Sequence, residues 1–231
     1  MSAQLISIEG LDGVGKGTQC KLIEQYCNTL SLKYKYFHFP MYGHNQFSNI
    51  ISMFLRGEFG NNDEVDPYFI ANAFAMDRWK FLPELQKHIE KNDIIILDRY
   101  VLSNIAYQSC KVPESEQSQI RDWITLLEFS FLKLPYPDLT LFLDIPVELS
   151  KNRLESRFKN ETRDYLQGKQ DIHEADIELQ NKVRTNYLNF TEFSNYNIIP
   201  CFLEFQTDTY LLTPKEIFNL YKPLIDKLIN N

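Results

Sequence analysis

The sequence lacks the features that mark several large protein classes. Its formal net charge of −7 argues against a broad cationic surface, so we expect no binding to a nucleic-acid polymer. Its cysteines form no CxxC pair and show no zinc-ligand spacing with histidine, which predicts reduced thiols. No apolar run reaches the roughly 18 residues that a membrane span needs, and no secretory signal opens the sequence. We therefore expect a cytoplasmic protein without a membrane partner.

Linkers, internal repeats and low-complexity segments are also missing. Residues 1–231 are therefore expected to form a single domain. The apolar fraction of 44% and the charged fraction of 24% lie near globular averages, which predicts a folded chain with a substantial core.

Short apolar segments alternate with stretches long enough to form helices. The strand candidates are Leu5–Ile8, Tyr34–Phe39, Asp93–Leu97, Leu139–Leu143 and Asn197–Leu203. Such alternation favours an α/β fold, in which helices flank a parallel sheet. Two almost wholly apolar candidates are followed directly by Asp98 and Asp144, and ligands gather at the carboxyl ends of such strands. Asp98 is the stronger candidate for a functional role.

A glycine-rich loop follows the first predicted strand and opens a predicted helix at about residues 16–30. In this context Gly10-Leu11-Asp12-Gly13-Val14-Gly15-Lys16 matches a Walker A motif. Its glycines let backbone N–H groups approach phosphate oxygens, and the lysine can reach the β- and γ-phosphates. The residues expected to bind ATP are Gly10, Asp12, Gly13, Val14, Gly15, Lys16, Gly17 and Thr18. The motif predicts a P-loop NTPase-type sheet, with a ligand-free glycine turn as the alternative.

Gly17 stands where the common motif has serine or threonine, and Thr18 follows it. Direct ligation of Mg²⁺ by the loop is therefore not expected. Mg²⁺ itself is expected, because the charge of a triphosphate must be neutralised during phosphoryl transfer. The loop alone leaves the acceptor open between water, a nucleotide and another small molecule.

Three further segments narrow the choice of acceptor. Phe39-Pro40 stands at the end of the second predicted strand, FAMDRW (74–79) lies in a predicted helix, and DRY (98–100) follows the third strand. With the GLDGVGKGTQ loop and the later LPYPDL that leads into LFLD, their order and spacing resemble the thymidylate kinase family over about residues 4–190. The resemblance implies transfer of a phosphoryl group from ATP to dTMP, with Mg²⁺, in a homodimer.

Phe74 and Arg78 are four residues apart and share one helix face, so a ring and a guanidinium can meet one planar ligand. The resemblance implies that Phe74 stacks on thymine and that Arg78 donates to its O4. Asn104, which has donor and acceptor capacity, is expected to read the pyrimidine edge, and Tyr107 to crowd the 2′ position of the sugar. Core packing is the alternative for Phe74 and for Tyr107.

Asp98 and Arg99 place opposite charges at a strand end, where a structural salt bridge is the alternative to a ligand site. The resemblance implies that Arg99 contacts the acceptor phosphate, and that Asp98 organises phosphate and Mg²⁺, the metal through water. It also implies that Asp12 engages the 3′-hydroxyl, whereas a turn-forming aspartate is the alternative. Further acceptor contacts are expected from Phe39, Pro40, Tyr42 and Ser103. Tyr42 stands near a position where family members often carry an arginine.

A polar stretch at about residues 155–174 lacks core periodicity and is expected to form a mobile lid. It carries Arg157 and Arg163, which are candidates for a catalytic arginine because the phosphate loop holds none. A solvated helix surface is the alternative for both. Glu174 is expected to contact sugar or phosphate, whereas His173 is not expected to carry a proton.

Two other functions stay open. Another deoxynucleotide or nucleoside kinase would share the ATP loop but change the acceptor pocket. A P-loop regulator would instead bind ATP to control a partner surface. Phe74, Arg78 and Asn104 favour a thymidylate acceptor. The apolar stretch Trp123–Leu134 fits either a subunit interface or the core.

Overall fold

The structure is a computed structural model that describes residues 2–158, 163–190, 195–205 and 208–230. The strands are β1 (Gln4–Glu9), β2 (Tyr34–His38), β3 (Ile94–Asp98), β4 (Leu139–Asp144), β5 (Tyr196–Pro200), β6 (Phe202–Phe205) and β7 (Asp208–Leu211). The helices are α1 (Lys16–Thr29), α2 (Gln46–Leu55), α3 (Pro67–Ile89), α4 (Val101–Ser109), α5 (Glu114–Thr125), α6 (Val147–Phe158), α7 (Ile172–Ala175), α8 (Ile177–Leu188) and α9 (Pro214–Ile229). There is also a π-helical turn, η1 (Leu126–Phe131), and a 3-10 turn, η2 (Asp164–Leu166). Within these ranges, no helix combines the length and the apolarity that a membrane span needs.

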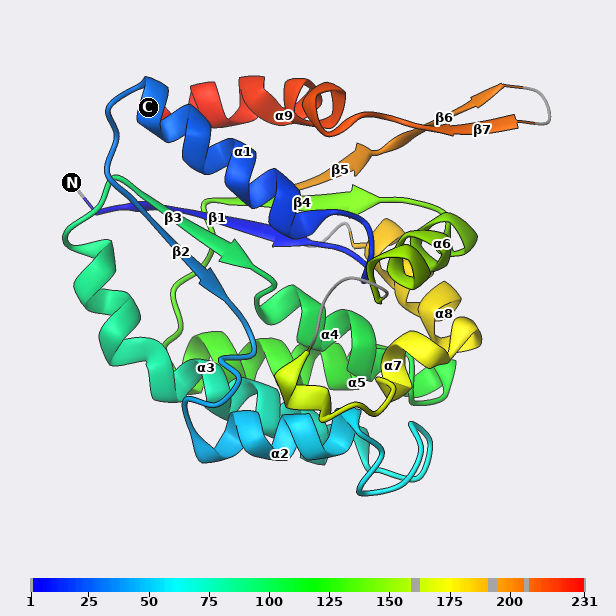
Figure 1. Ribbon diagram of the computed structural model, residues 1–231. Helices are drawn as coiled ribbons and strands as arrows, with labels where there is room; N and C mark the ends of the chain where they lie inside the picture. Colours follow the sequence, from blue (N-terminus) through cyan, green and yellow to red (C-terminus); the bar gives the residue numbers. More distant parts are fainter. Residues whose placement is uncertain (1, 159–162, 191–194, 206–207, 231) are drawn as a thin grey trace.

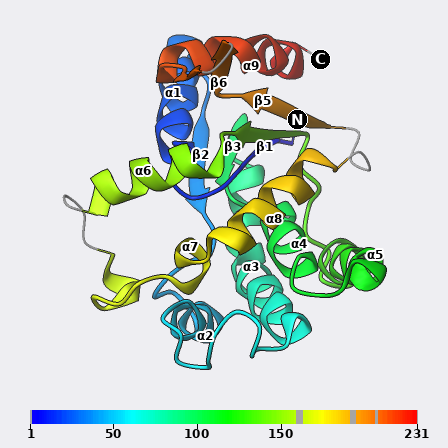
Figure 2. The same cartoon turned by 90° about the vertical axis from the view of Figure 1, so that its right-hand side faces the viewer.

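A five-stranded parallel sheet forms the centre of the molecule, in the order β2-β3-β1-β4-β5. Figure 1 shows α1 and α9 on one face of the sheet and α3 and α4 on the other. The carboxyl ends of the strands point toward the side where α6, α7 and α8 lie (Figures 1 and 2). The predicted α/β fold with a parallel sheet flanked by helices is confirmed.

The central strands are apolar because helices cover both of their faces. Ile6 of β1 lies opposite Ile96 of β3 and Leu139 of β4. The residues of Ile94–Leu97 are at most 1% exposed. β1, β2, β3 and β4 agree with the predicted strands to within one residue at each end. The sheet therefore brings the loop after β1 next to the residues that follow β3.

The predicted strand Asn197–Leu203 is wrong in its extent. β5 ends at Pro200, which has no N–H group to extend the ladder. Cys201 donates its N–H to the carbonyl oxygen of Asp144 at 2.9 Å, and β6 then pairs antiparallel with β7. The chain thus leaves the sheet as a hairpin, which projects beyond β5 in Figure 1.

The predicted lid contains helical turns as well as loop. α6 continues to Phe158, and η2 and α7 follow in the second half, while residues 159–162 lie outside the described part of the chain. Leu166 is buried, and Arg56 donates from Nη1 to the carbonyl oxygen of Tyr165 at 2.6 Å. The part after residue 162 is therefore held against the end of α2.

The apolar stretch Trp123–Leu134 divides between core and surface. α5 continues into η1, where Leu132 donates its N–H to a carbonyl five residues earlier at 2.9 Å. Glu128 is fully buried in this turn, whereas Leu126 and Phe131 are 51% and 71% exposed. π turns are rare and often lie at functional sites. This one carries a carboxylate into the interior of the protein.

Replacement of Ile96 by alanine tests the sheet core. Ile96 is fully buried between β1 and β2, so the variant loses apolar contacts and leaves a cavity. We expect the free energy of unfolding to fall by about 2–5 kcal/mol. Urea unfolding followed by circular dichroism measures this change. Ile198→Ala is the control, because Ile198 is 41% exposed on the edge strand β5. Equal losses in the two variants would contradict the prediction.

Candidate active site

The glycine-rich loop between β1 and α1 has a backbone shape that excludes most side chains. Gly13 has φ +83°, and a Cβ at this position would lie 2.4 Å from the carbonyl oxygen of Ser150 in α6. Only glycine meets both conditions without movement of the neighbouring backbone. Lys16 is the first residue of α1, and the N–H groups of a first helical turn lack intrahelical partners. The loop and the helix start are therefore suited to bind an anion.

Lys16 is buried beneath this loop. Its Nζ donates to the carbonyl oxygens of Gly10 at 3.1 Å and Leu11 at 2.8 Å, and lies 3.6 Å from Asp12 Oδ1. Burial, assisted by the charge of Arg99, lowers the pKa of Lys16. The lysine borders a cavity of about 690 Å³, which we call the phosphate-loop cavity. It is lined by residues 12–21 together with side chains that include Tyr36, His38, Asp98 and Arg153.

Asp98 ends β3 and faces the start of α1. Its Oδ2 accepts a hydrogen bond from the Tyr36 hydroxyl at 3.2 Å, and lies 3.9 Å from the place that a Cβ on Gly17 would take. Its Oδ1 is buried and has no hydrogen-bond partner among the described residues. Burial of a polar atom without a partner is unfavourable. This oxygen is therefore available to a cation or to a donor beside the loop.

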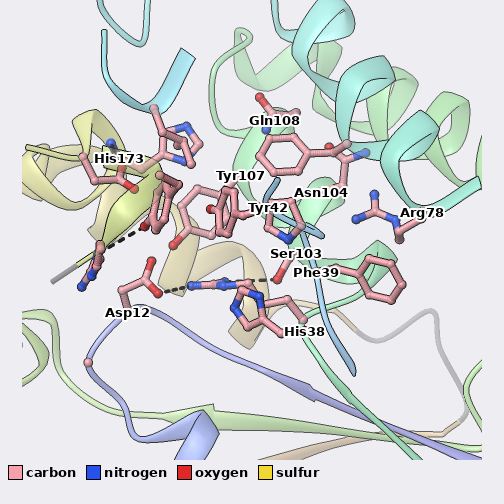
Figure 3. A pocket seen from close by; sticks show the side chains of 18 of the residues that line it. Asp12, His38, Phe39, Tyr42, Arg78, Ser103, Asn104, Tyr107, Gln108 and His173 are labelled. Carbon is pink, nitrogen blue, oxygen red and sulfur yellow. Dashed lines mark hydrogen bonds and ion pairs between the residues drawn. The ribbon is translucent and has the colours of Figure 1, made fainter. Parts of the chain in front are cut away.

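Arg99 connects the end of β3 to the glycine-rich loop. It donates from Nη2 to Asp12 Oδ1 at 2.6 Å and from Nη1 to Ser103 Oγ at 3.2 Å (Figure 3). Burial alone would raise the pKa of Asp12, but Arg99 and Lys16 more than offset this effect and hold that pKa below its ordinary value. The ion pair of Arg99 is thus with Asp12, and not with the neighbouring Asp98 that the sequence offered.

A second cavity, of about 380 Å³, meets the first at Asp12, Gly13 and His38, which line both. We call it the aromatic cavity. Its ring-bearing walls include Phe39, Tyr42, Phe74, Tyr107, Tyr165 and His173, and its polar side chains include Arg78, Arg99, Ser103, Asn104, Gln108 and Arg163. Figure 3 shows many of these side chains around one space. Aromatic walls with a few fixed polar groups suit a planar ligand.

Arg78 and Asn104 are held by a carboxylate behind the aromatic cavity. Arg78 donates from Nε and Nη2 to the two carboxylate oxygens of Glu128, both at 2.6 Å. Asn104 donates from Nδ2 to Glu128 Oε1 at 2.8 Å and to the carbonyl oxygen of Ala71 at 3.0 Å. Burial disfavours the charge of Arg78, but Glu128 more than offsets it, so the pKa of Arg78 lies above its ordinary value. Asn104 Oδ1 is buried without a partner among the described residues.

The segment after residue 162 forms one wall of the aromatic cavity. The rings of Tyr42 and Tyr165 stack with 3.9 Å between their centroids and 5° between their planes. Arg163 donates from Nη1 to Glu174 Oε1 at 2.5 Å. Burial, with Asp12 nearby, raises the pKa of Glu174 to about 7 despite this ion pair. Arg163 therefore lines the cavity, while Glu174 balances its charge from α7.

His173 is a buried wall of the aromatic cavity. Its ring stacks on Tyr107 with 4.9 Å between centroids, and its Nε2 lies 2.9 Å from Lys111 Nζ. Burial, followed by the charge of Lys111, lowers the pKa of His173 well below its ordinary value. Burial likewise lowers the pKa of Lys111 to about 7. A neutral imidazole thus packs beside Tyr107 in this wall.

Known proteins resemble this chain over most of its length. A sequence profile described as "Thymidylate kinase" matches residues 8–205. The chain belongs to the thymidylate kinase family. The thymidylate kinase of Mycobacterium tuberculosis is 33% identical to it over 183 residues, which cover 79% of this chain and 83% of that protein. A probable thymidylate kinase of Methanococcus vannielii is 29% identical over 216 residues, which cover 94% and 92% of the two chains.

A solved structure shows the same fold. The thymidylate kinase of Candida albicans matches with a TM-score of 0.69 and 22% identity, over 99% of this chain and 93% of that one. Members of the thymidylate kinase family are phosphotransferases, so this chain is an enzyme of that class.

Most residues predicted for a thymidylate kinase site border the two cavities. The phosphate-loop cavity has Asp12, Gly13, Val14, Gly15, Lys16, Gly17, Thr18 and Asp98. The aromatic cavity has Asp12, Phe39, Pro40, Tyr42, Phe74, Arg78, Arg99, Ser103, Asn104, Tyr107 and Arg163. Gly10 begins the loop and its carbonyl oxygen accepts from Lys16, while Glu174 pairs with Arg163. Arg157 belongs to α6, and its side chain lies outside the described part of the chain.

Sequence reasoning missed several side chains of this site. Gln108 follows Tyr107 in the same segment and lines the aromatic cavity, where both polar atoms of its amide are buried without partners among the described residues. The sequence does contain an indication of the role of Glu128, because a lone carboxylate inside an apolar stretch requires a buried cation or hydrogen-bond donor as its partner. No sequence pattern indicates that His38 and Tyr165 line the cavity, since their positions depend on the packing of distant segments.

Replacement of Gly13 by alanine tests the shape of the loop. The added methyl group would collide with the carbonyl oxygen of Ser150, so the loop must move away from its anion-binding shape. We expect ATP affinity, measured by calorimetry, to fall about tenfold or more, because the aligned N–H groups are lost. Gly43→Ala is the matched control, since Gly43 also has positive φ but no atom of the described residues lies within 4 Å of its added Cβ. Unchanged ATP affinity in Gly13→Ala would refute the prediction.

Proposed function

We propose that the chain transfers the γ-phosphoryl group of ATP to dTMP, giving dTDP and ADP. The observation that carries this proposal is the junction of the phosphate-loop cavity with the aromatic cavity at Asp12, Gly13 and His38. A phosphoryl donor in the first cavity would face an acceptor in the second. Membership of the thymidylate kinase family supports the same reaction.

ATP would bind with its phosphates in the phosphate-loop cavity. The loop amides and the N-terminus of α1 would supply donors and positive partial charge. Lys16 would exchange the carbonyl oxygens of Gly10 and Leu11 for oxygens of the β- and γ-phosphates. Thr18 would donate its hydroxyl to the phosphates from the first turn of α1.

The base of dTMP would bind in the aromatic cavity. Phe74 would stack on the ring, which is worth about 1–3 kcal/mol in other base-binding sites. Thymine presents an acceptor, O4, beside a donor, N3–H. Arg78 keeps N–H groups that Glu128 does not use, and Asn104 Oδ1 accepts no hydrogen bond from the described residues. Gln108 could serve the second carbonyl of the base, and Tyr107 would leave no room for a 2′-hydroxyl.

The sugar and phosphate of dTMP would lie toward the junction of the cavities. Asp12 would accept a hydrogen bond from the 3′-hydroxyl. Arg99, which the ion pair with Asp12 already holds at the junction, would donate to the acceptor phosphate. Ser103 and the Tyr42 hydroxyl would add neutral donors. Phe39 and Pro40 would complete the wall beside the phosphate.

Mg²⁺ would bind beside Asp98. Protein sites for Mg²⁺ use one or two carboxylates together with phosphates and water. Asp98 fits this chemistry, because its Oδ1 is buried without a partner among the described residues and the side chain lines the phosphate-loop cavity. Gly17 offers no hydroxyl, so we propose that Asp98 holds the ion through water. The bound ion would neutralise charge on the β- and γ-phosphates.

The transfer step would need alignment and charge neutralisation more than an enzyme nucleophile. A phosphate oxygen of dTMP, already anionic, would attack the γ-phosphorus while the bond to the oxygen bridging the β- and γ-phosphates breaks. Lys16, Arg99 and the loop amides would stabilise the transition state. Residues 155–174 would act as a lid that excludes water, and Arg157 or Arg163 would supply the arginine that the loop lacks.

We further propose that residues 1–231 form a single domain that acts in the cytoplasm as a homodimer. The exposed side chains of Leu126 and Phe131 give the π turn an apolar outer surface, which a second subunit could cover.

Coupled ADP release with ATP and Mg²⁺ tests the reaction. We expect release that depends on dTMP and exceeds that with dUMP, thymidine, AMP or UMP at matched concentrations, because the base edge and the acceptor phosphate must both be recognised. Equal activity with thymidine or AMP would point to another kinase specificity. ADP release that no acceptor changes would refute the proposal and favour an ATPase or a regulator.

Replacement of Arg163 by alanine tests the lid. Arg163 lines the aromatic cavity and is close enough to lower the pKa of Asp12 together with Arg99 and Lys16, so we place it near the transferred group. We expect kcat to fall on the order of 100-fold, with a smaller rise in KM for dTMP.

Lys169→Ala is the control for Arg163→Ala. Lys169 lies on the same segment, is 54% exposed and pairs with Glu58 outside the cavity, so kcat should stay near that of the unmodified enzyme. A loss of kcat in Arg157→Ala but not in Arg163→Ala would show that Arg157 is the catalytic arginine of the lid. A change in KM alone would contradict a catalytic arginine at residue 163.

A further inference from the structure

Glu128 is a fully buried carboxylate that binds two side chains of the aromatic cavity. One of its oxygens accepts from Arg78 Nε, and the other accepts from Arg78 Nη2 and from Asn104 Nδ2, all within 2.6–2.8 Å. The contacts span 50 and 24 residues of sequence. Glu128 itself stands behind both side chains, where it would not touch a ligand in the cavity.

These contacts fix which polar atoms Asn104 can offer. Its amide nitrogen has two hydrogens, and the oxygens of Glu128 and Ala71 accept them. Rotation of the amide by 180° would turn its carbonyl oxygen toward two other oxygens, which is unfavourable in a buried site. Asn104 therefore has only an acceptor left, and that atom is buried without a partner among the described residues.

The same carboxylate fixes Arg78 as a donor. Two of its five N–H groups bind Glu128 in a bidentate pair, which sets the plane of the guanidinium and leaves three N–H groups. Because Glu128 balances the charge, Arg78 can remain buried at 2% exposure beside the cavity. The cavity wall thus offers a donor next to an acceptor.

That pair complements one type of pyrimidine edge. A 4-oxo pyrimidine presents a carbonyl acceptor at position 4 and an N–H donor at position 3, which match Arg78 and Asn104. A 4-amino pyrimidine presents the reverse order, so its amino group would meet Arg78 and its ring nitrogen would meet Asn104 Oδ1. Sites built on fixed hydrogen bonds reject such mismatches strongly, because buried polar groups are left unpaired.

We propose that Glu128 is the positioning residue that sets the selectivity of the acceptor site for 4-oxo over 4-amino pyrimidine nucleotides. The inference rests on the proposed function, and it assigns the choice of base to a residue outside the cavity. The π turn η1 contributes directly, because Glu128 lies within it and is fully buried, while Leu126 and Phe131 of the same turn face solvent.

Glu128→Gln is the decisive variant, because it keeps the size of the side chain and removes one acceptor. The new amide nitrogen would face donors of Arg78 or Asn104, and Asn104 could turn its amide to match it. Dissociation constants for dTMP and dCMP, measured by calorimetry, report the effect. We expect the preference for dTMP over dCMP to fall on the order of 10- to 100-fold, while ATP affinity stays unchanged.

Asp144→Asn is the matched control. Asp144 also accepts a bidentate pair from an arginine, Arg184, at 2.7 and 3.0 Å, and is likewise a buried carboxylate. Loss of that ion pair should lower stability without changing the ratio of dTMP to dCMP affinity. The control separates the positioning role of Glu128 from the general cost of removing a buried charge.

Glu128→Asp keeps the charge but shortens the reach, so it provides a second measurement if Glu128→Gln fails to fold. A carboxylate drawn back by one methylene cannot keep both sets of contacts, and the base preference should fall here too. A folded variant of either kind that keeps the base preference of the unmodified protein would overturn the proposal. Failure of both variants to fold would also overturn it, because Glu128 would then serve stability.

The unmodified protein distinguishes this inference from the proposed function. If it shows no preference for dTMP over dCMP, the proposed function fails first. If it shows the preference and the folded Glu128→Gln variant keeps it, the proposed function stands and only the role of Glu128 is refuted.

Discussion

The ion pair between Arg99 and Asp12 links the two halves of the site. Asp12 belongs to the loop after β1, and Arg99 follows β3, its hydrogen-bonded neighbour in the sheet. Parallel pairing alone therefore brings the two charges to the same edge. The pair offsets part of the desolvation cost of two partly buried charges, since the side chains of Arg99 and Asp12 are 12% and 31% exposed. Lys16 Nζ lies 3.6 Å from Asp12 Oδ1, and Ser103 Oγ accepts a hydrogen bond from Arg99. Each residue thus contacts one member of the ion pair.

Features that depend on local sequence could be predicted, and those that depend on distant pairing could not. The phosphate loop follows from glycine spacing between a strand and a helix, and the family motifs named most lining residues of both cavities. The lone carboxylate of Glu128 in an apolar stretch indicates that it needs a partner, but Arg78 and Asn104 lie 50 and 24 residues away, so the local pattern does not identify them. Pro200 is a local indication that β5 ends early, because proline has no N–H group for the ladder. The hairpin that follows depends instead on pairing between β6 and β7.

The segment after residue 162 shows why composition alone describes a lid poorly. Its polar residues have no core periodicity, yet specific contacts hold it: the stack of Tyr165 on Tyr42, the bond from Arg56 to the Tyr165 carbonyl, and the pair of Arg163 with Glu174. None of these contacts is visible as a burial pattern in the sequence. Because Tyr42 is also a cavity wall, movement of this segment and the shape of the aromatic cavity are mechanically connected.

Because residue 17 is glycine, the side chain beside the phosphates that would hold a cation comes from the end of β3 and not from the phosphate loop. A serine or threonine there would bring a hydroxyl close to Asp98, since its Cβ would lie 3.9 Å from Oδ2. That hydroxyl would approach the oxygen that already accepts from Tyr36, and it would offer a cation an oxygen ligand from the loop. With glycine, Asp98 accepts from Tyr36 through Oδ2, and its Oδ1 has no partner in the part of the chain that the structure describes. The geometry around a cation would thereby be set by the end of a rigid central strand, and not by a loop that must adjust whenever nucleotide enters or leaves.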